Sequence, residues 1–320
     1  MWPIFGHEFA VKLMLRSIQT HTVSHAYLIA GLPHIGKTTL AQTFAQALNC
    51  TGAAPPCQTC RSCQLGARHP DISIIEPERG RIKIGAIRTL QSAAALSPIE
   101  GRYRIYVISQ IDTATLSAAN CLLKTLEEPP ERVVLILTAN RIAALLPTIV
   151  SRCQVLNLRP LPASQVISAL QPLVDQEQAN LLGHLAQGRI GWAYSAASEP
   201  RLLEQRNHLV EQLLELDTMT YTERFAFAER QSKKPEQIPE LLYTMRSWWR
   251  DILLLAAQSK APVANIDRQA ELEQIAAQTG VDTALAMLRS IDQTAWRLEH
   301  NANSRLALEV LLLDMPSKQR

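Results

Sequence analysis

The chain has 320 residues, 47% of them hydrophobic and 19% charged, so it is long enough for two or three domains and needs no disulfides to fold. A formal net charge of +3, with no run of Lys or Arg longer than two residues, excludes nucleic-acid binding through bulk positive charge. The longest apolar stretches, Val133–Leu137 and Ile252–Ala257, are far shorter than the roughly 20 residues that cross a bilayer, which excludes a membrane protein.

The first half of the chain alternates strand-like and helix-like patterns. Five short runs have the composition of buried strands: His25–Ala30, Ile72–Ile75, Tyr103–Ile108, Val133–Thr138 and Val155–Leu158. Helical patterns lie between them, at Thr38–Leu48, Ala86–Leu96 and Thr115–Leu126. This alternation predicts a parallel α/β domain over residues 1–160.

The segment after the first predicted strand has the pattern of a phosphate-binding loop. Residues 31–38, GLPHIGKT, fit G-x-x-x-x-G-K-[ST], in which backbone N–H groups face phosphate oxygens, the lysine supplies charge and the hydroxyl meets Mg²⁺. Gly31, Gly36, Lys37, Thr38 and Thr39 are therefore candidate ligands of ATP and Mg²⁺. The alternative is a chance match in a loop without function. The strand before the loop and the helix after it argue against that alternative.

Two residues weaken this loop as a nucleotide site. Pro33 has no N–H to offer, and His34 stands where glycine is more usual. Histidine accepts a positive φ better than most residues, but less readily than glycine. We expect nucleotide binding, with an affinity that the sequence leaves open.

Four cysteines follow the P-loop helix in the pattern C-x6-C-x2-C-x2-C: Cys50, Cys57, Cys60 and Cys63. The short gaps let four thiolates surround one tetrahedral Zn²⁺, and four protein ligands leave no open position, so the predicted zinc module at residues 50–63 is structural. The alternative is a surface loop of unliganded thiols. It is disfavoured because clustered exposed thiols are reactive.

The other two cysteines, Cys121 and Cys153, lie apart from this cluster. The N-terminus has no charged start followed by an apolar core, the pattern of a signal peptide. Metal-binding thiols and the missing signal together predict a reduced, cytoplasmic setting.

The end of the third predicted strand separates an active ATPase from an inactive one. In P-loop ATPases the strand beside the P-loop strand usually ends in Asp-Glu, which hold the magnesium shell and polarise the attacking water. Here Ser109 and Gln110 stand at that point, so we expect negligible hydrolysis by the isolated chain. Asp112 is a possible substitute, although its position before a predicted helix favours a role as a helix cap.

The second half is helical almost throughout. Two short helices, Ser164–Leu173 and Glu177–Ala186, predict a small helical lid over residues 161–205. Long amphipathic segments from about Arg206 predict a helical bundle over residues 206–320. Trp248 and Trp249 are adjacent, which places either one or both of them in its core.

Several segments together resemble bacterial DNA polymerase III clamp-loader subunits. They are the HAYLIAG lead-in (residues 25–31), the cysteine insertion, LLKTLEEPP (residues 122–130), Ser151-Arg152-Cys153 and the terminal NxxxRLALEVLLL pattern (residues 301–313). The resemblance covers the whole chain and is strongest over residues 24–160. It implies an AAA+ module, a helical lid and a collar, through which five subunits form a ring that opens a sliding clamp and places it on primed DNA.

Within this family the chain is similar to the delta-prime type, which does not hydrolyse ATP. The motor type, gamma/tau, keeps the Asp-Glu pair and carries a lid arginine where Gly191 stands here, which leaves Arg189 as a solvated side chain. The resemblance implies gamma/tau and delta subunits as partners. It also implies that Arg152 reaches the ATP of a neighbouring subunit as an arginine finger. The alternative for Arg152 is a salt bridge to an acidic residue of its own domain.

Three functions from different classes remain open on the sequence. The first is a delta-prime subunit, which completes its neighbour's ATPase site. The second is a gamma/tau-type motor, which requires Asp112 or another carboxylate to replace the missing pair. The third is a zinc-dependent nucleic-acid-binding module, for which the sequence has no basic stripe or aromatic platform.

Overall fold

The computed structural model describes Trp2 and residues 4–316. The chain divides into two compact units: residues 1–169 with 188–192, and residues 170–187 with 193–320. The three-domain division expected from the sequence, with boundaries at residues 160 and 205, stays a prediction. In the part of the chain that is described, no helix combines the length and the apolar character of a membrane span.

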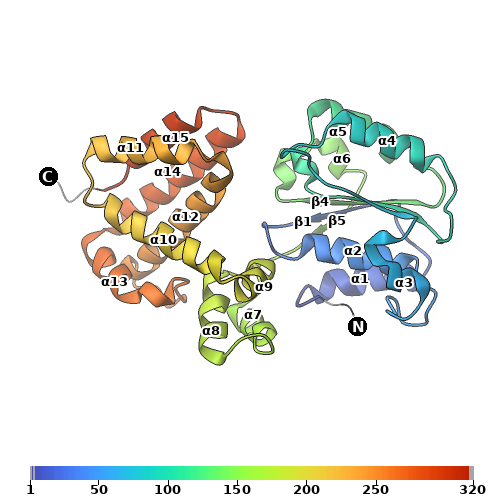
Figure 1. The fold of residues 1–320 in the computed structure, drawn as a ribbon, viewed down its shortest axis with the longest axis horizontal. Coiled ribbons are helices and arrows are strands. Elements are labelled where there is room, and N and C mark those ends of the chain that lie inside the picture. Colours follow the sequence, from blue (N-terminus) through green and yellow to red (C-terminus); the bar gives the residue numbers. More distant parts are fainter. Residues whose placement is uncertain (1, 3, 317–320) are drawn as a thin grey trace. The chain divides into compact units, whose positions relative to one another are not determined.

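A five-stranded parallel sheet forms the centre of the first unit (Figure 1). Its strand order is β2-β3-β4-β1-β5, and all neighbouring strands run parallel. The strands are β1 (Ala26–Ala30), β2 (Ile72–Ile75), β3 (Arg104–Ile108), β4 (Val133–Ala139) and β5 (Gln154–Asn157). Each lies within one residue of a run expected from the sequence, so the predicted parallel α/β fold is confirmed.

Helices cover both faces of this sheet, because parallel strands are buried on both sides (Figure 1). One layer contains α1 (Glu8–Gln19) and α2 (Lys37–Leu48), with α3 (Arg61–Leu65) beside α2. The other layer contains α4 (Ile84–Ala94), α5 (Leu116–Glu127) and α6 (Pro147–Val150). Short 3₁₀ turns are η1 (Gly66–Arg68), η2 (Ile111–Thr113) and η3 (Ile142–Ala144). Helix α1 is not among the elements expected from the sequence.

Successive residues of each strand point to opposite helix layers. In β1, Ala26 and Leu28 pack with residues of α4 and α5, whereas Tyr27 and Ile29 pack with residues of α1 and α2. Burial of one large apolar side chain is worth about 1.5–3 kcal/mol, and a one-residue slip would exchange the two faces of a strand. This packing fixes the register, and it brings the carboxyl ends of all five strands to one edge, where the P-loop lies.

The chain after β5 is helical. Its helices are α7 (Ala163–Leu170), α8 (Gln176–Leu185), α9 (Ile190–Ser198), α10 (Pro200–Leu216), α11 (Tyr221–Ser232), α12 (Ile238–Ala256), α13 (Gln269–Gln278), α14 (Val281–Glu299) and α15 (Ser304–Leu313), with 3₁₀ turns η4 (Pro235–Gln237) and η5 (Ile266–Arg268). Three begin at side-chain caps: Asp175 for α8, Thr220 for α11 and Asn303 for α15. Such caps are worth about 0.5–2 kcal/mol each, because they satisfy N–H groups that the helix leaves unpaired.

The second unit has a core of its own, formed mainly by α10 to α15. Trp248 and Trp249 are both buried in it, so of the two placements left open by the sequence, the core holds both rings. Arg224 of α11 is buried too, and its guanidinium donates to the carbonyl oxygens of Leu216, Leu312, Met315 and Pro316. A cation at the carboxyl ends of α10 and α15 is stabilised by their helix dipoles.

Candidate nucleotide site and metal centre

The P-loop joins β1 to α2 at the carboxyl edge of the sheet. Its backbone requires the two glycines of the motif: Gly36 caps α2 with φ +102°, and a Cβ on Gly31 would lie 2.8 Å from the carbonyl oxygen of Leu158. His34 has a φ of 60°, the positive value expected from the sequence. Thr38 and Thr39 are exposed in the first turn of α2, where a phosphate group would meet the helix N-terminus.

Lys37 is engaged by the protein itself. Its ammonium donates to the carbonyl oxygens of Gly31 (2.8 Å) and Leu32 (2.6 Å) and to Oδ1 of Asn140 (2.9 Å). Burial lowers the pKa of Lys37 to about 8, and the charge of Asp112 opposes this shift. A triphosphate would have to replace the carbonyl contacts. Asn140 follows β4 directly, and it was not predicted as a site residue because Lys37 lies 103 residues away in the sequence.

The first turn of α9 lies directly on the P-loop. The N–H of Gly191 donates to the carbonyl oxygen of His34 at 2.7 Å, and a Cβ on Gly191 would lie 2.8 Å from that oxygen. No larger residue fits at this position without movement of the backbone. Arg189 is only 3% exposed and its guanidinium lies over the Trp192 ring, so the expectation of a solvated arginine is wrong.

The strand that ends in Ser109-Gln110, β3, was expected from the sequence to lie beside the P-loop strand, and this placement is wrong. β4 lies between β3 and β1. The backbone N–H of Gln110 donates to the Thr138 hydroxyl of β4, and the Ser109 side chain is buried. The two residues at the carboxyl end of β3 are therefore uncharged, and they lie one strand away from the P-loop strand.

Asp112 is not a helix cap, which corrects the role favoured from the sequence. It lies in η2, and Thr115 caps α5 by accepting the N–H of Ala118. Instead, Oδ2 of Asp112 accepts the backbone N–H of Asn140 at 3.1 Å. A cap assignment made from sequence spacing alone fails here because the 3₁₀ turn η2 separates Asp112 from the start of α5 at Leu116.

A cleft of about 610 Å³ borders the same part of the first unit. Residues 7–10 at the start of α1 and residues 155–162 at the end of β5 line it, together with Gln165. One nitrogen of the His7 ring lies 3.0 Å from the carbonyl oxygen of Ile35 in the P-loop. The cleft thus adjoins the phosphate-binding loop through His7.

The four cysteines expected to bind metal come together after α2. Their sulfur atoms all lie within 4.8 Å of one another, and Sγ of Cys60 is 4.0 Å from Sγ of Cys50. Tetrahedral zinc with Zn–S bonds near 2.3 Å requires sulfurs about 3.8 Å apart, so the cluster fits Zn²⁺. Cys121 and Cys153 are outside the cluster, as expected.

The surroundings of the sulfurs also fit metal-bound thiolates. Backbone N–H groups of Gly52 and Cys57 each lie 3.3 Å from Sγ of Cys50, and that of Cys60 lies 3.3 Å from Sγ of Cys57. The Thr59 hydroxyl and the backbone N–H groups of Cys60 and Thr59 lower the pKa of the Cys57 thiol to about 5, whereas burial raises the pKa values of the Cys50 and Cys63 thiols. Gly52 leaves the room that the cluster needs, because a Cβ there would lie 2.8 Å from Sγ of Cys57.

Side chains on both sides of the cysteine cluster attach it to the sheet. The Asn49 amide bonds both backbone groups of Tyr103, next to β3. The Asp71 carboxylate accepts the backbone N–H groups of residues 99–101, and these bonds lower its pKa against the opposing effect of burial. The cysteine cluster is thus continuous with the α/β core.

Arg152 lies between α6 and β5 on the surface of the first unit. Its guanidinium is 2.8 Å from a carboxylate oxygen of Glu127 and donates to the carbonyl oxygen of Thr148 at 3.0 Å. The two side chains are 35% and 50% exposed. The internal salt bridge considered as the alternative is therefore present in the single chain, but an exposed pair of this kind is worth only about 0–1 kcal/mol.

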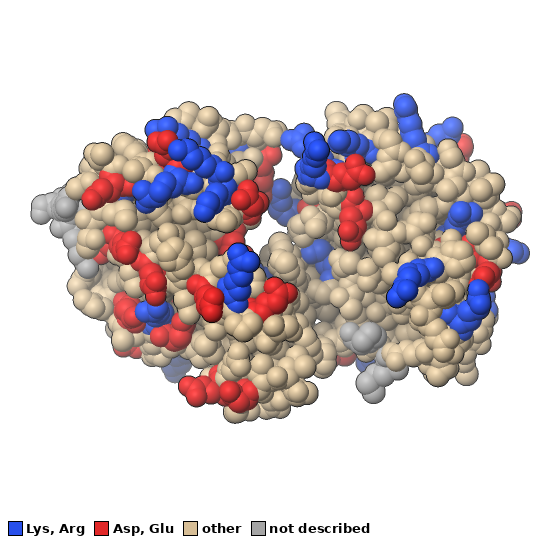
Figure 2. Space-filling view, viewed as in Figure 1, with Lys and Arg blue, Asp and Glu red and all other residues tan. Residues whose placement is uncertain are grey.

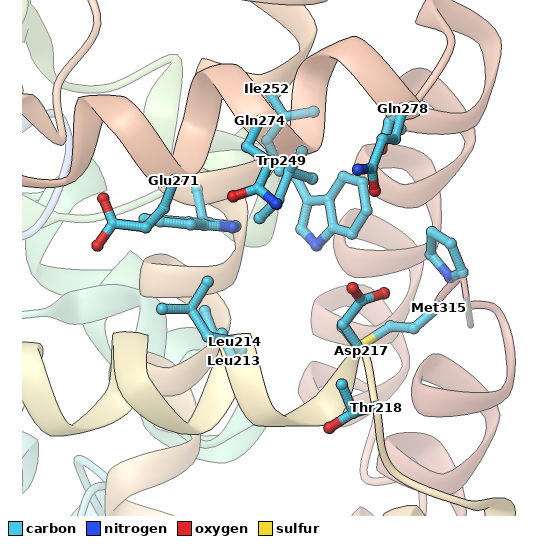
Figure 3. A pocket seen from close by; sticks show the side chains of 14 residues that line it. Leu213, Leu214, Asp217, Thr218, Trp249, Ile252, Glu271, Gln274, Gln278 and Met315 are labelled. Carbon is cyan, nitrogen blue, oxygen red and sulfur yellow. The ribbon is translucent and has the colours of Figure 1, made fainter. Parts of the chain in front are cut away.

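The second unit contains a cavity of about 270 Å³ between α10, α12 and α13 (Figure 3). Trp249, Glu271, Gln274 and Asp217 are among the residues that line it. None of the site residues predicted from the sequence contributes to this cavity. On the face of the molecule seen in Figure 2, acidic and basic side chains are interspersed over both units, with neutral surface between them.

Comparison with known proteins places the chain in a family. Residues 6–162 match the family model described as DNA polymerase III, delta subunit, and residues 200–316 match its C-terminal counterpart. The chain is 29% identical to DNA polymerase III subunit delta' of Bacillus subtilis over 95% of its own length and 94% of that relative.

Relatives named tau/gamma match over a shorter region. The chain is 30% identical to DNA polymerase III subunit tau/gamma of Haemophilus influenzae over 71% of its own length, and it spans about a third (35%) of that relative. A gamma subunit-related protein of Thermotoga maritima aligns with a TM-score of 0.45 and 18% identity, over 94% of this chain and 97% of that one. The two family models and the nearly full-length match to a delta' subunit lead to one conclusion: the chain belongs to the delta-prime family of DNA polymerase III clamp-loader subunits.

Proposed function

We propose that this chain is a cytoplasmic clamp-loader component that joins gamma/tau- and delta-type subunits in a five-membered AAA+ ring. The ring loads a sliding clamp onto primer-template DNA during replication. In it, the chain contributes Arg152 to the ATP site of a neighbouring subunit and does not hydrolyse ATP itself.

The position of Arg152 is the observation that carries this proposal. The residue lies on the surface, held by one exposed carboxylate and one carbonyl oxygen. Release from an exposed salt bridge costs about 0–1 kcal/mol, whereas an arginine finger accelerates phosphoryl transfer by about 10³–10⁵, or roughly 4–7 kcal/mol. The pair with Glu127 is therefore too weak to keep Arg152 from a neighbour's γ-phosphate.

The uncharged end of β3 supports the lack of hydrolysis. Neither Ser109 nor Gln110 can polarise water as a carboxylate does, and loss of a general base reduces rates by about 10²–10⁴. Nucleotide binding is a separate property, supported by the P-loop, by Lys37 and by the cleft beside it. A gamma/tau-type motor remains the second candidate, because Asp112 lies at the same sheet edge.

The cysteine cluster supports a bound Zn²⁺ with a structural role. Cys50, Cys57, Cys60 and Cys63 would hold the ion, which would link the two ends of the segment between α2 and β2. Four sulfur ligands leave no position for a reacting water, so no catalytic step is assigned to this centre.

A ring reconstituted from this chain with gamma/tau- and delta-type subunits tests the finger. Arg152→Ala should leave ring assembly and zinc content unchanged, while clamp- and DNA-stimulated ATP hydrolysis falls, by about 10³-fold or more at the affected site. Arg152→Lys should restore little, because a flexible ammonium does not reproduce the planar guanidinium. Arg201→Ala, a change of another exposed arginine, is the matched control.

Two outcomes contradict the proposal. Parental hydrolysis and clamp loading by the Arg152→Ala ring would show that Arg152 is not a finger. Steady-state ATP turnover by the isolated chain, abolished by Lys37→Ala, would replace the delta-prime role with that of a motor.

A further inference from the structure

The carboxyl edge of the sheet holds an acidic side chain that the proposed function does not use. Asp112 is connected to the P-loop through one residue. Its Oδ2 accepts a hydrogen bond from the backbone N–H of Asn140, and Oδ1 of Asn140 accepts a hydrogen bond from the Lys37 ammonium. Asp112 also acts electrostatically on Lys37. A carboxylate three residues beyond Ser109 thus acts on the lysine of the P-loop.

Two oxygens at this edge have no hydrogen-bond partner within the described part of the chain. They are Oδ1 of Asp112 and Oγ of Ser109, both shielded from solvent, and the Ser109 residue is only 4% exposed. A buried polar atom without a partner costs about 1–3 kcal/mol. Native proteins keep such atoms mainly where a ligand, an ion or a water satisfies them.

We propose that Asp112 supplies the carboxylate for the Mg²⁺ that accompanies nucleotide in this P-loop, with the Ser109 hydroxyl at the same edge of the sheet. This inference rests on the proposed nucleotide site. Mg²⁺ in phosphate sites is held by one or two carboxylates and substrate phosphates, and it keeps several waters. One acid at the metal and none beside it to activate water give a site that binds Mg·ATP without turning it over.

The competing role for Asp112 is charge balance. A buried lysine is stabilised by a nearby carboxylate whether or not a metal binds. The two roles differ in their dependence on Mg²⁺: a charge-balancing residue affects nucleotide affinity equally with and without the ion, whereas a metal-associated residue affects only the affinity measured with it.

Calorimetric titration of the zinc-loaded full chain with ATP, in Mg²⁺ and in EDTA, separates the two roles. In the wild type, Mg²⁺ should tighten binding. Asp112→Asn should reduce the ratio of the two affinities by about 10- to 100-fold, the usual effect of losing a group that orients or holds a metal, while the affinity in EDTA changes little. Glu76→Gln, which removes an exposed carboxylate just after β2, is the matched control.

Zinc content and thermal unfolding show whether each variant is folded. If Asp112→Asn is not, Asp112→Ser repeats the test with a smaller side chain that still offers an oxygen to the Asn140 N–H. An unchanged Mg²⁺ dependence in the folded variant overturns the proposal, as does a wild-type chain that binds no ATP in either buffer. Neither result affects the Arg152 finger, which is measured on ATP hydrolysis by the neighbouring subunits.

Discussion

At the scale of one residue, the surroundings of Gly191 leave no room for a side chain. Its Cα approaches the P-loop so closely that any side chain would meet the His34 carbonyl oxygen. The hydrogen bond between Gly191 N–H and His34 O holds the two segments at this distance. Any larger residue at this position would require a wider separation of residues 188–192 from the P-loop.

Substitution of Gly191 tests this contact. We expect Gly191→Ala to displace residues 188–192 from the P-loop and to lower the free energy of unfolding by about 1–2 kcal/mol, through the lost hydrogen bond and the displaced backbone. The amide of Gly191 should lose protection in hydrogen exchange. Gly85→Ala is the control, because a Cβ added at this position would have no other atom within 4 Å. Alanine in α4 should be neutral or stabilising. Equal protection in Gly191→Ala and the wild type would refute the close contact.

At the scale of elements, local patterns were sufficient for the strands and for the two ligand motifs. β-rich runs predicted all five strands because each is buried on both faces, and the spacing of the cysteines predicted their cluster because its ligands are close in sequence. Helix α1 was not predicted because the side chain of its N-cap residue, His7, makes no capping hydrogen bond and one of its three buried residues is the polar Ser17. Asn140 was not predicted because its contact with Lys37 depends on strand order.

Tertiary contacts also explain two errors in the roles that were assigned from the sequence. Arg189 was expected in solvent because arginine is usually exposed, but it packs over Trp192 three residues later. Asp112 was expected to cap a helix, but η2 turns the chain so that it bonds Asn140 across the sheet edge. In both cases tertiary contacts override a correct local preference.

The cysteine cluster permits a prediction about residues 50–68. Removal of Zn²⁺ with a chelator should speed amide exchange in residues 50–68 by about tenfold or more, or roughly 1.4 kcal/mol of local stability. The rest of the first unit should stay folded, because Asn49 and Asp71 attach both ends of this segment to the sheet independently of the metal.

Cysteine variants provide the control for this experiment. Cys60→Ser should lose the metal and reproduce the chelated state, whereas Cys121→Ser, outside the cluster, should keep one zinc per chain. Zinc-free protein from a preparation without chelator, or full zinc content in Cys60→Ser, would contradict the assignment.

At the scale of the whole molecule, the proposed ring requires a surface on the second unit that other subunits can cover. Helix α15 presents Leu306, Val310 and Leu313 at helical spacing, and these residues are 59%, 41% and 46% exposed. The opposite side of the helix is buried through Ala307, Leu308, Leu311 and Leu312. A helix that is apolar on both sides within one chain is typical of a subunit interface.

We therefore predict that Leu306→Asp prevents incorporation into the ring, because a buried unpaired carboxylate costs several kcal/mol, while the zinc content and thermal unfolding of the isolated chain stay unchanged. Leu173→Asp, at an exposed leucine between α7 and α8, controls for lost surface hydrophobicity. Size-exclusion chromatography of the reconstituted mixture measures both variants, and co-elution of Leu306→Asp with its partners at the parental level would exclude α15 from the interface.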